Sequence, residues 1–252
     1  MFRSLVLGAC LIGAILGITM TALQAVGVTP ILLAAEQYEV GDDPHPAAID
    51  GSHEQGGQAG HHHDDIAWAP ADGAERLVYT AVSNVGAGIG FAAILLVLMN
   101  QLSQRGRLRL TPVRGLLVGA LCYLAVFVAP SLGLPPEIPG ASAAALEARQ
   151  LWWLATVASA AAGLGLLALA PGWTRWLGLP LLLAPYTWVP THQGPLFLNP
   201  DPQAVAALTA LHHEFIWASG LSNLAFWLLA GLLCALVLKR LAGTSRDDEV
   251  PA

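Results

Sequence analysis

The sequence predicts an all-α, polytopic integral membrane protein with about six transmembrane helices, five being the alternative. Both termini are expected in the cytoplasm, and a long external loop is rich in histidine and acidic residues. Of the 252 residues, 55% are hydrophobic and only 11% are charged, whereas a soluble domain usually carries about a quarter charged residues. The mean hydropathy is +0.59. A single water-soluble domain and a disordered chain are both excluded, because too few charges remain to cover a globular surface.

Six apolar runs come close to or exceed the roughly 20 helical residues that a hydrocarbon core requires. They lie at residues 5–33, 77–102, 115–130, 151–170, 176–190 and 216–238, and we expect them to form one membrane domain. The first run is too long for the core of a signal peptide, so we expect it to stay uncleaved. Because it is also longer than the membrane is thick, it should tilt or bend near Gly27 and Pro30.

The fifth run is the weakest of the six, because it is short and contains Pro180 and Pro185. Two interpretations stay open for it. The first, which we favour, is a short and kinked but ordinary span. The second is a re-entrant segment that lines a cavity.

The positions of Lys and Arg predict the orientation, since these residues accumulate in cytoplasmic loops. With six spans, nine of the 11 basic residues fall on one side, and only Arg76 and Arg149 fall on the other. Five spans would move Lys239 and Arg240 to the outer side, so we prefer six. The tail at residues 240–252 is then cytoplasmic.

All eight histidines fall on the external side of this topology, although they played no part in deriving it. The external loop at residues 36–75 holds ten acidic residues and five histidines, with no Lys or Arg. Imidazole suits divalent cobalt, nickel, zinc and copper, and carboxylates add negative charge. The alternative is a polar loop that only solvates the outer face. The predicted metal ligands in the loop are His45, His53, His61, His62, His63, Asp64 and Asp65.

A second group of predicted metal ligands follows the fifth run. Asp201 and Pro202 resemble the N-cap and first turn of a helix that continues into the last span. Neighbouring helical residues point about 100° apart, so two adjacent histidines cannot both face one ion from a rigid helix. The alternative is a set of interfacial polar residues at a helix start. The group consists of His192, His212, His213 and Glu214.

Polar side chains within the spans are neutral, so no proton relay is indicated. Asn84 and Asn223 could line a passage, or they could hydrogen-bond between helices, which is the commoner role. Glu36 lies where the first run ends. It could form an anionic collar at the outer mouth, or it could be an exposed interfacial acid.

Several function classes are excluded. The formal net charge of −6 argues against nucleic-acid binding, and no phosphate-binding loop or HExxH motif occurs, so we predict that the protein is not an enzyme. No histidine lies at mid-membrane depth to hold a haem. Cys10, Cys122 and Cys234 are isolated in apolar runs and are predicted to be packing residues. We expect no permanently bound cofactor.

Four strings resemble a known family. They are residues 30–39 (Pro-Ile-Leu-Leu-Ala-Ala-Glu-Gln-Tyr-Glu), 68–76 (Trp-Ala-Pro-Ala-Asp-Gly-Ala-Glu-Arg), 133–140 (Gly-Leu-Pro-Pro-Glu-Ile-Pro-Gly) and 148–153 (Ala-Arg-Gln-Leu-Trp-Trp). Together with the histidine cluster between the first two, they resemble the probable cobalt transporter subunit family CbtA over nearly the whole chain.

The resemblance implies a bacterial inner-membrane protein that supplies cobalt for cobalamin synthesis, with a small single-span, histidine-bearing partner subunit. Assembly as a homo-oligomer is a further option. It also implies that Glu137, in its proline-rich turn, could belong to the outer mouth. The family places a histidine after a proline near the fifth span, where this chain has Tyr186. Either His192 takes that place or the site differs. The family is also often drawn with five spans.

The sequence therefore favours a permease for a divalent transition metal, cobalt first and nickel or zinc next, with a capture loop outside the membrane. The alternative is a membrane-bound metal sensor or buffer that does not transport. Besides that metal ion, we expect the lipid bilayer and the partner subunit as binding partners, and no nucleic acid.

Overall fold

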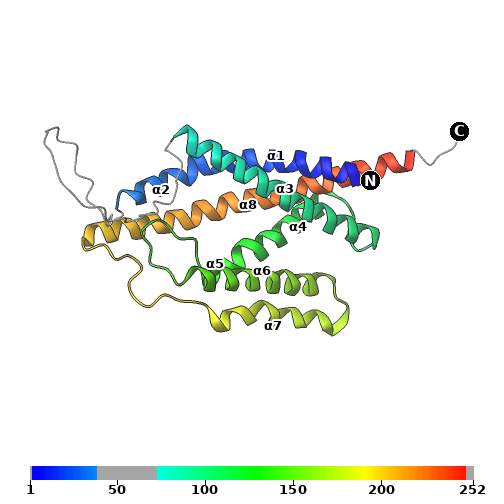
Figure 1. The fold of residues 1–252 in the computed structure, drawn as a ribbon. Coiled ribbons are helices and arrows are strands. Elements are labelled where there is room, and N and C mark those ends of the chain that lie inside the picture. Colours follow the sequence, from blue (N-terminus) through cyan, green and yellow to red (C-terminus); the bar gives the residue numbers. More distant parts are fainter. Residues whose placement is uncertain (1, 39–72, 248–252) are drawn as a thin grey trace, which may run out of the picture.

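The computed structural model describes residues 2–38 and 73–247, and in these ranges the chain is helical apart from short connections (Figure 1). The single β-type pairing in these ranges is an isolated bridge between Ala141 and Phe197. The predicted all-α class is confirmed. The elements are α1 (Phe2–Gly27), α2 (Thr29–Glu36), α3 (Ala74–Gln104), α4 (Pro112–Tyr123), η1 (Leu124–Val128), α5 (Ala129–Gly133), α6 (Leu146–Leu169), η2 (Gly172–Leu177), α7 (Gly178–Leu183), η3 (Ala184–Trp188) and α8 (Pro202–Asp247).

Five helices in the described ranges are long and apolar enough to cross a membrane. Large apolar side chains such as Leu11, Leu117 and Leu154 are exposed on their outer surfaces, as a surface that faces lipid requires. These helices correspond to five of the six predicted runs. They are Arg3–Gly27, Ala74–Gln104, Pro112–Gly133, Leu146–Leu169 and Pro202–Ala242.

The remaining run, predicted at 176–190, forms the consecutive segments η2, α7 and η3 of six, six and five residues. It runs back alongside α6 in the opposite direction (Figure 1). A 3₁₀ helix rises about 2.0 Å per residue against 1.5 Å for an α-helix, so these segments extend over about 30 Å. The stretch is too short and irregular to count as a sixth long helix, yet it is about as long as a hydrocarbon core is thick.

Prolines explain the two irregular helices. Pro30 has no N–H to donate to the preceding turn, and the first helix is interrupted at Val28 between α1 and α2. This agrees with the bend expected near Gly27 and Pro30. In the third span, the turn before Pro130 widens into the π-helical segment η1, where the Ala129 N–H donates to the Leu124 carbonyl.

Glycines allow two pairs of helices to pack at backbone contact. Between α1 and α3, a Cβ built on Gly88 would lie 2.6 Å from the Gly13 carbonyl oxygen, and between α4 and α8 a Cβ on Gly115 would lie 2.6 Å from the Gly231 carbonyl oxygen. Small residues at a helix interface permit this approach in membranes, where dispersion forces drive helix association. A core of buried side chains from α1, α3 and α8, including Leu16, joins the pairs. The four helices form one bundle.

Helix α6 and the stretch from η2 to η3 form a hairpin beside this bundle (Figure 1). Within it, Gly163 and Gly178 lie at backbone contact, and the Trp152 indole donates to the Pro185 carbonyl. The hairpin contacts the bundle through η1, α5 and α4. The hairpin therefore packs along the irregular third span, which consists of α4, η1 and α5.

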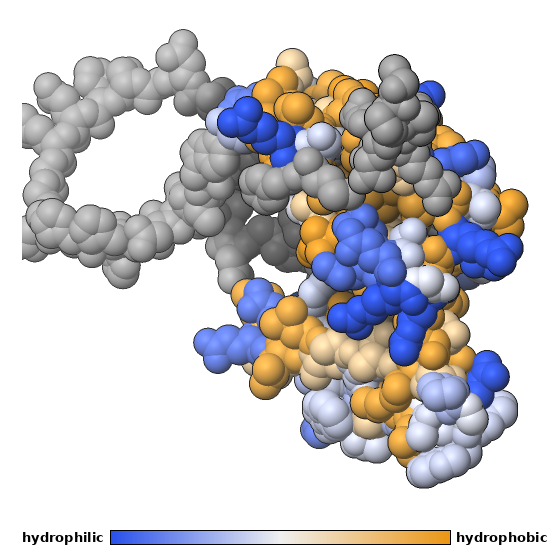
Figure 2. Space-filling model, turned by 90° about the vertical axis from the view of Figure 1, so that its right-hand side faces the viewer, coloured by the Kyte–Doolittle hydropathy of each residue, from blue (hydrophilic) through white to orange (hydrophobic). Residues whose placement is uncertain are grey.

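The start of α1 and the end of α8 lie at one end of the molecule (Figure 1). The α3–α4 connection, with Arg105, Arg107 and Arg109, and η2, with Arg175, lie at the same end. Figure 2 looks onto this end and shows hydrophilic side chains gathered among hydrophobic ones. We name the opposite end, where α2 ends and α3, α6 and α8 begin, the outer end, after the side to which the predicted topology assigns it.

Helix α8 is the element that builds the outer end. Its 46 residues span about 69 Å, more than twice the thickness of a hydrocarbon core. It starts at Pro202, as predicted, and continues into the last span without a break. A small buried cluster of Ala35, Ile138, Phe197 and Leu208 packs α2 and the segments 134–145 and 189–201 against its first turns. These two segments carry the side chains of the candidate site.

Candidate functional site

The predicted ligands of the external loop lie outside the described residues. They are His45, His53, His61, His62, His63, Asp64 and Asp65, all within residues 39–72. Their role in metal binding stays a prediction. The remaining candidates, from Glu36 to Asn223, all lie in described parts of the chain.

Three of the remaining candidates line one cavity at the outer end. Glu137 comes from segment 134–145, His192 from segment 189–201 and His212 from α8, and the cavity has a volume of about 230 Å³. Two prolines precede Glu137, and their rings fix their own φ and so stiffen the turn that leads to it. Gly194 adopts a φ of +133° in the turn after His192, a conformation that favours glycine. We name this the histidine cavity.

His212 is tied to the neighbouring segment. Its Nε2 lies 3.0 Å from the Pro136 carbonyl oxygen, and its ring packs edge-on against Phe197. Since a carbonyl only accepts, Nε2 must donate this hydrogen bond, which leaves the lone pair on Nδ1. A metal ion could bind Nδ1 directly, or Nε2 after this hydrogen bond breaks.

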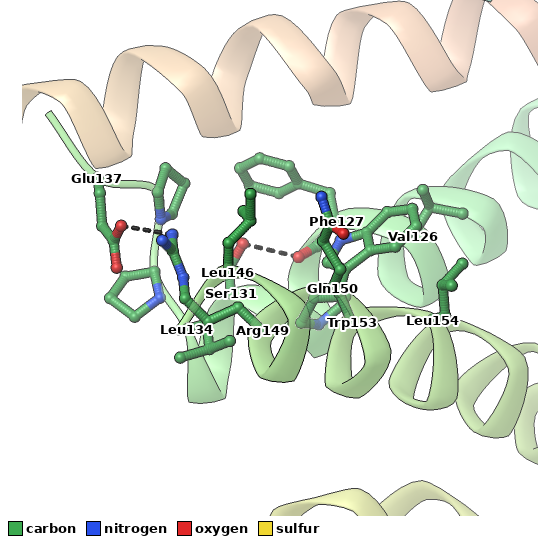
Figure 3. Close-up of a pocket in the computed structure, with 13 residues that line it drawn as sticks. Val126, Phe127, Ser131, Leu134, Glu137, Leu146, Arg149, Gln150, Trp153 and Leu154 are labelled. Atoms are coloured by element: carbon green, nitrogen blue, oxygen red, sulfur yellow. Dashed lines mark hydrogen bonds and ion pairs between the residues drawn. The ribbon is translucent and has the colours of Figure 1, made fainter. Parts of the chain in front are cut away.

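Glu137 is held by Arg149 at the start of α6, with 2.5 Å between Arg149 Nη2 and Glu137 Oε2. Both side chains are partly buried, since Arg149 is 29% exposed and Glu137 is 22% exposed. The pair lies at one end of a second, apolar cavity of about 530 Å³ between η1, α5 and α6 (Figure 3). We name this the apolar groove. Glu137 lines both cavities, whereas Arg149 lines the groove and not the histidine cavity.

Glu36 forms a second ion pair at the outer end, between described residues. Arg76 Nη2 and Nη1 donate to its two carboxylate oxygens at 2.7 and 3.2 Å, which ties α2 to α3. Arg76 and Arg149 are the two basic residues that the predicted topology places outside. Each is engaged by a carboxylate, so neither adds an isolated positive charge to this end.

His213 and Glu214 lie on the exposed side of α8. His213 Nε2 accepts a hydrogen bond of 3.3 Å from the indole of Trp217, one turn further along the helix. It does not line the histidine cavity, whereas His212 does. The two neighbouring histidines therefore have different surroundings, as the helical geometry requires.

The two asparagines differ in their contacts. Asn84 Nδ2 donates to Gln24 Oε1 at 2.7 Å and to Thr21 Oγ1 at 3.0 Å, so it joins α3 to α1. Asn223 Nδ2 donates to the Ser219 carbonyl of its own helix at 3.0 Å. Asn84 thus has the interhelical bonding that is common for polar residues in membranes.

Replacing Asn84 with alanine is expected to destabilise the folded protein by about 0.6 to 2 kcal/mol, since two interhelical hydrogen bonds are lost. Asn223→Ala is the control, because it removes a hydrogen bond within one helix. Thermal unfolding of the two purified variants in the same detergent measures the difference. An equal loss of stability in both variants would contradict the interhelical role.

No three His, Cys, Asp or Glu side chains within residues 2–38 and 73–247 are close enough together to hold a metal ion. The histidine cavity thus has the right donors for a transition metal, two imidazoles and a carboxylate, but they do not converge. Two of the three side chains have protein partners, Pro136 and Arg149. The cysteines Cys10, Cys122 and Cys234 are free thiols.

The role of Arg149 at this site is clear only from the structure. Within the sequence, its signals were a place near a helix start, on a side that holds only one other basic residue, and membership of the string 148–153 that carries the family resemblance. The Pro136 carbonyl carries no sequence signal at all, because every residue has one.

The chain matches the sequence pattern of a known protein family. The sequence pattern of CbtA, described as "Probable cobalt transporter subunit", matches residues 2–239 of the chain. No curated protein and no solved structure matches the chain.

Proposed function

The chain belongs to the CbtA family of probable cobalt transporter subunits, and on this premise we propose that it carries divalent cobalt across the bacterial inner membrane for cobalamin synthesis. The observation that supports this most is the histidine cavity, which collects His192, His212 and Glu137 from three separate segments at one end of a helical membrane bundle. Imidazole nitrogens select transition metals over the more abundant alkali and alkaline-earth ions.

The external loop serves as the capture segment in this proposal. Its ten acidic residues raise the local concentration of cations, and His61, His62 and His63 bind the metal with modest affinity. The ion then moves to the histidine cavity and crosses along neutral polar side chains between the helices. Membrane potential is the simplest energy source for the inward movement of a cation.

The proposed orientation of the chain in the membrane supports this route for the ion. We propose that all six apolar runs cross, with the stretch from η2 to η3 as the sixth span, so that the basic end faces the cytoplasm. Its approximate length of 30 Å and its antiparallel course beside α6 favour a crossing over a re-entrant segment. The outer end, with the histidine cavity, then faces the capture loop.

The word subunit in the family description implies a partner. We propose that this partner is a small single-span membrane protein with histidines of its own, as the resemblance implies. It would bring further ligands to the site, in which the described residues alone do not converge on an ion.

Uptake of radioactive cobalt in a bacterial strain that lacks other cobalt importers tests this function, with the partner expressed alongside. The wild-type chain should raise uptake clearly above empty vector. Deletion of residues 41–65 should lower uptake several-fold at low external cobalt and less at high cobalt, because the capture loop acts by concentrating the ion. Immunoblots of membrane fractions control for expression.

Wild-type uptake equal to empty vector would contradict transport. Metal binding by the purified protein, without flux into proteoliposomes, would instead indicate the membrane sensor or buffer. Uptake that survives the deletion unchanged would show that the ion reaches the outer histidines directly.

A further inference from the structure

Glu137 occupies the wall between the two cavities, and its carboxylate is turned toward Arg149 in the apolar groove (Figure 3). We infer that the Arg149 guanidinium is a tethered cation that competes with the substrate ion for this carboxylate, and that only an ion able to displace it enters the site. The inference rests on the proposed function and adds a residue that determines specificity.

The contacts of the Glu137–Arg149 ion pair favour replacement of the guanidinium by another cation. Among the described residues, Arg149 binds Glu137 through Nη2 alone, and its buried Nε has no hydrogen-bond partner there. Arg76, in contrast, holds Glu36 through two nitrogens on two oxygens. A guanidinium that uses one nitrogen and leaves another buried and unpaired is less stabilised than a bidentate pair, so it is easier to displace.

Charge decides which ions can displace it. At equal distance a divalent ion interacts with the carboxylate twice as strongly as the single positive charge of Arg149. The imidazoles of His192 and His212 line the same cavity and would add nitrogen ligands, which cobalt and nickel favour and alkali ions do not. Sodium and potassium would thus gain too little to release the guanidinium.

The apolar groove offers space and polar groups to the Arg149 guanidinium after it leaves Glu137. The apolar groove of about 530 Å³ extends from Arg149 along α6 and is also lined by the polar side chains of Gln150 and Ser131. Their oxygens can accept hydrogen bonds. Arg149 can therefore leave Glu137 without losing all polar contact, while the carboxylate turns toward the histidine cavity.

Cobalt binding to the purified full-length chain tests the competition. The titration follows the visible absorption of bound cobalt and the heat of binding, in a background with His61→Ala, His62→Ala and His63→Ala so that the capture loop does not dominate. Arg149→Gln should bind cobalt about tenfold more tightly than this background. Arg149→Lys, which keeps a mobile positive charge, should lie between the two. Arg76→Gln is the matched control at the other outer ion pair and should change the affinity less than twofold.

The same substitution in a Glu137→Gln chain separates competition from long-range repulsion. If Arg149 acts by occupying the carboxylate, Arg149→Gln should no longer tighten binding once that carboxylate is gone. Tightening that persists in the Glu137→Gln chain would overturn the inference, and so would unchanged or weaker binding by Arg149→Gln in a chain that melts normally. Loss of cobalt binding in every chain, wild type included, would instead contradict the proposed function itself.

Discussion

Replacing both His192 and His212 with alanine is expected to lower the initial rate of cobalt uptake about tenfold or more. The change removes both imidazoles from the histidine cavity and leaves Glu137 as its remaining strong ligand. A tenfold loss corresponds to about 1.4 kcal/mol, a modest estimate for the loss of two nitrogen ligands to a transition metal. Radioactive cobalt uptake at sub-saturating concentration is the measurement.

His213→Ala is the matched control for this experiment. It changes the same residue type one position along α8, on the exposed side, where the side chain contacts Trp217. Uptake by this variant should stay within about twofold of wild type. A larger loss with His213→Ala than with the double variant would place the ion on the other side of α8 and contradict the role of the histidine cavity.

Replacing Gly231 with alanine should strongly destabilise the bundle. The new Cβ would lie 2.7 Å from the Gly119 nitrogen and 2.9 Å from the Gly119 Cα, so α4 and α8 would have to move apart. Overpacking of this kind usually costs about 1 to 3 kcal/mol, and the obstacle here is backbone, which cannot rotate away. Thermal unfolding in detergent measures the effect.

Gly86→Ala separates the clash from helix propensity. Gly86 is also helical, in α3, but no atom outside its own helix lies within 4 Å of its Cβ position. Alanine is the better helix former by about 1 kcal/mol, so this variant should be as stable as wild type or more stable. If both variants unfold at the same temperature, contact between α4 and α8 does not limit stability.

Composition and periodicity were enough to predict most of the fold. The apolar runs at 77–102 and 216–238 lie inside long helices and the run at 151–170 extends one residue beyond its helix, because hydrophobic length alone decides whether a segment can cross a bilayer. The bend near Pro30 and the helix start at Pro202 also follow from local chemistry. The run at 176–190 was predicted less well. Its 3₁₀ segments rise further per residue than an α-helix, so the number of apolar residues underestimates the length of the segment.

Sequence reasoning selected the correct residue types for the site but not their arrangement. His192 and His212 were predicted in one group of ligands and Glu137 apart from it, and the structure brings all three to one cavity. The pairing of Glu137 with Arg149 and of Glu36 with Arg76 was not predicted. Each pair joins residues from different elements, whose distance depends on how the helices pack.

By itself, the sequence determined that this is a helical membrane protein with most of its basic residues expected at one end and its histidines at the other. Those properties follow from hydropathy and charge, which act on each segment separately through the slab geometry of a bilayer. The tertiary structure alone decided that His212 meets Pro136, 76 positions away, and that Arg149 holds the carboxylate of the same turn. The reason is that side-chain contacts between distant segments depend on helix packing, here on glycines that let backbones touch, and no local pattern encodes them.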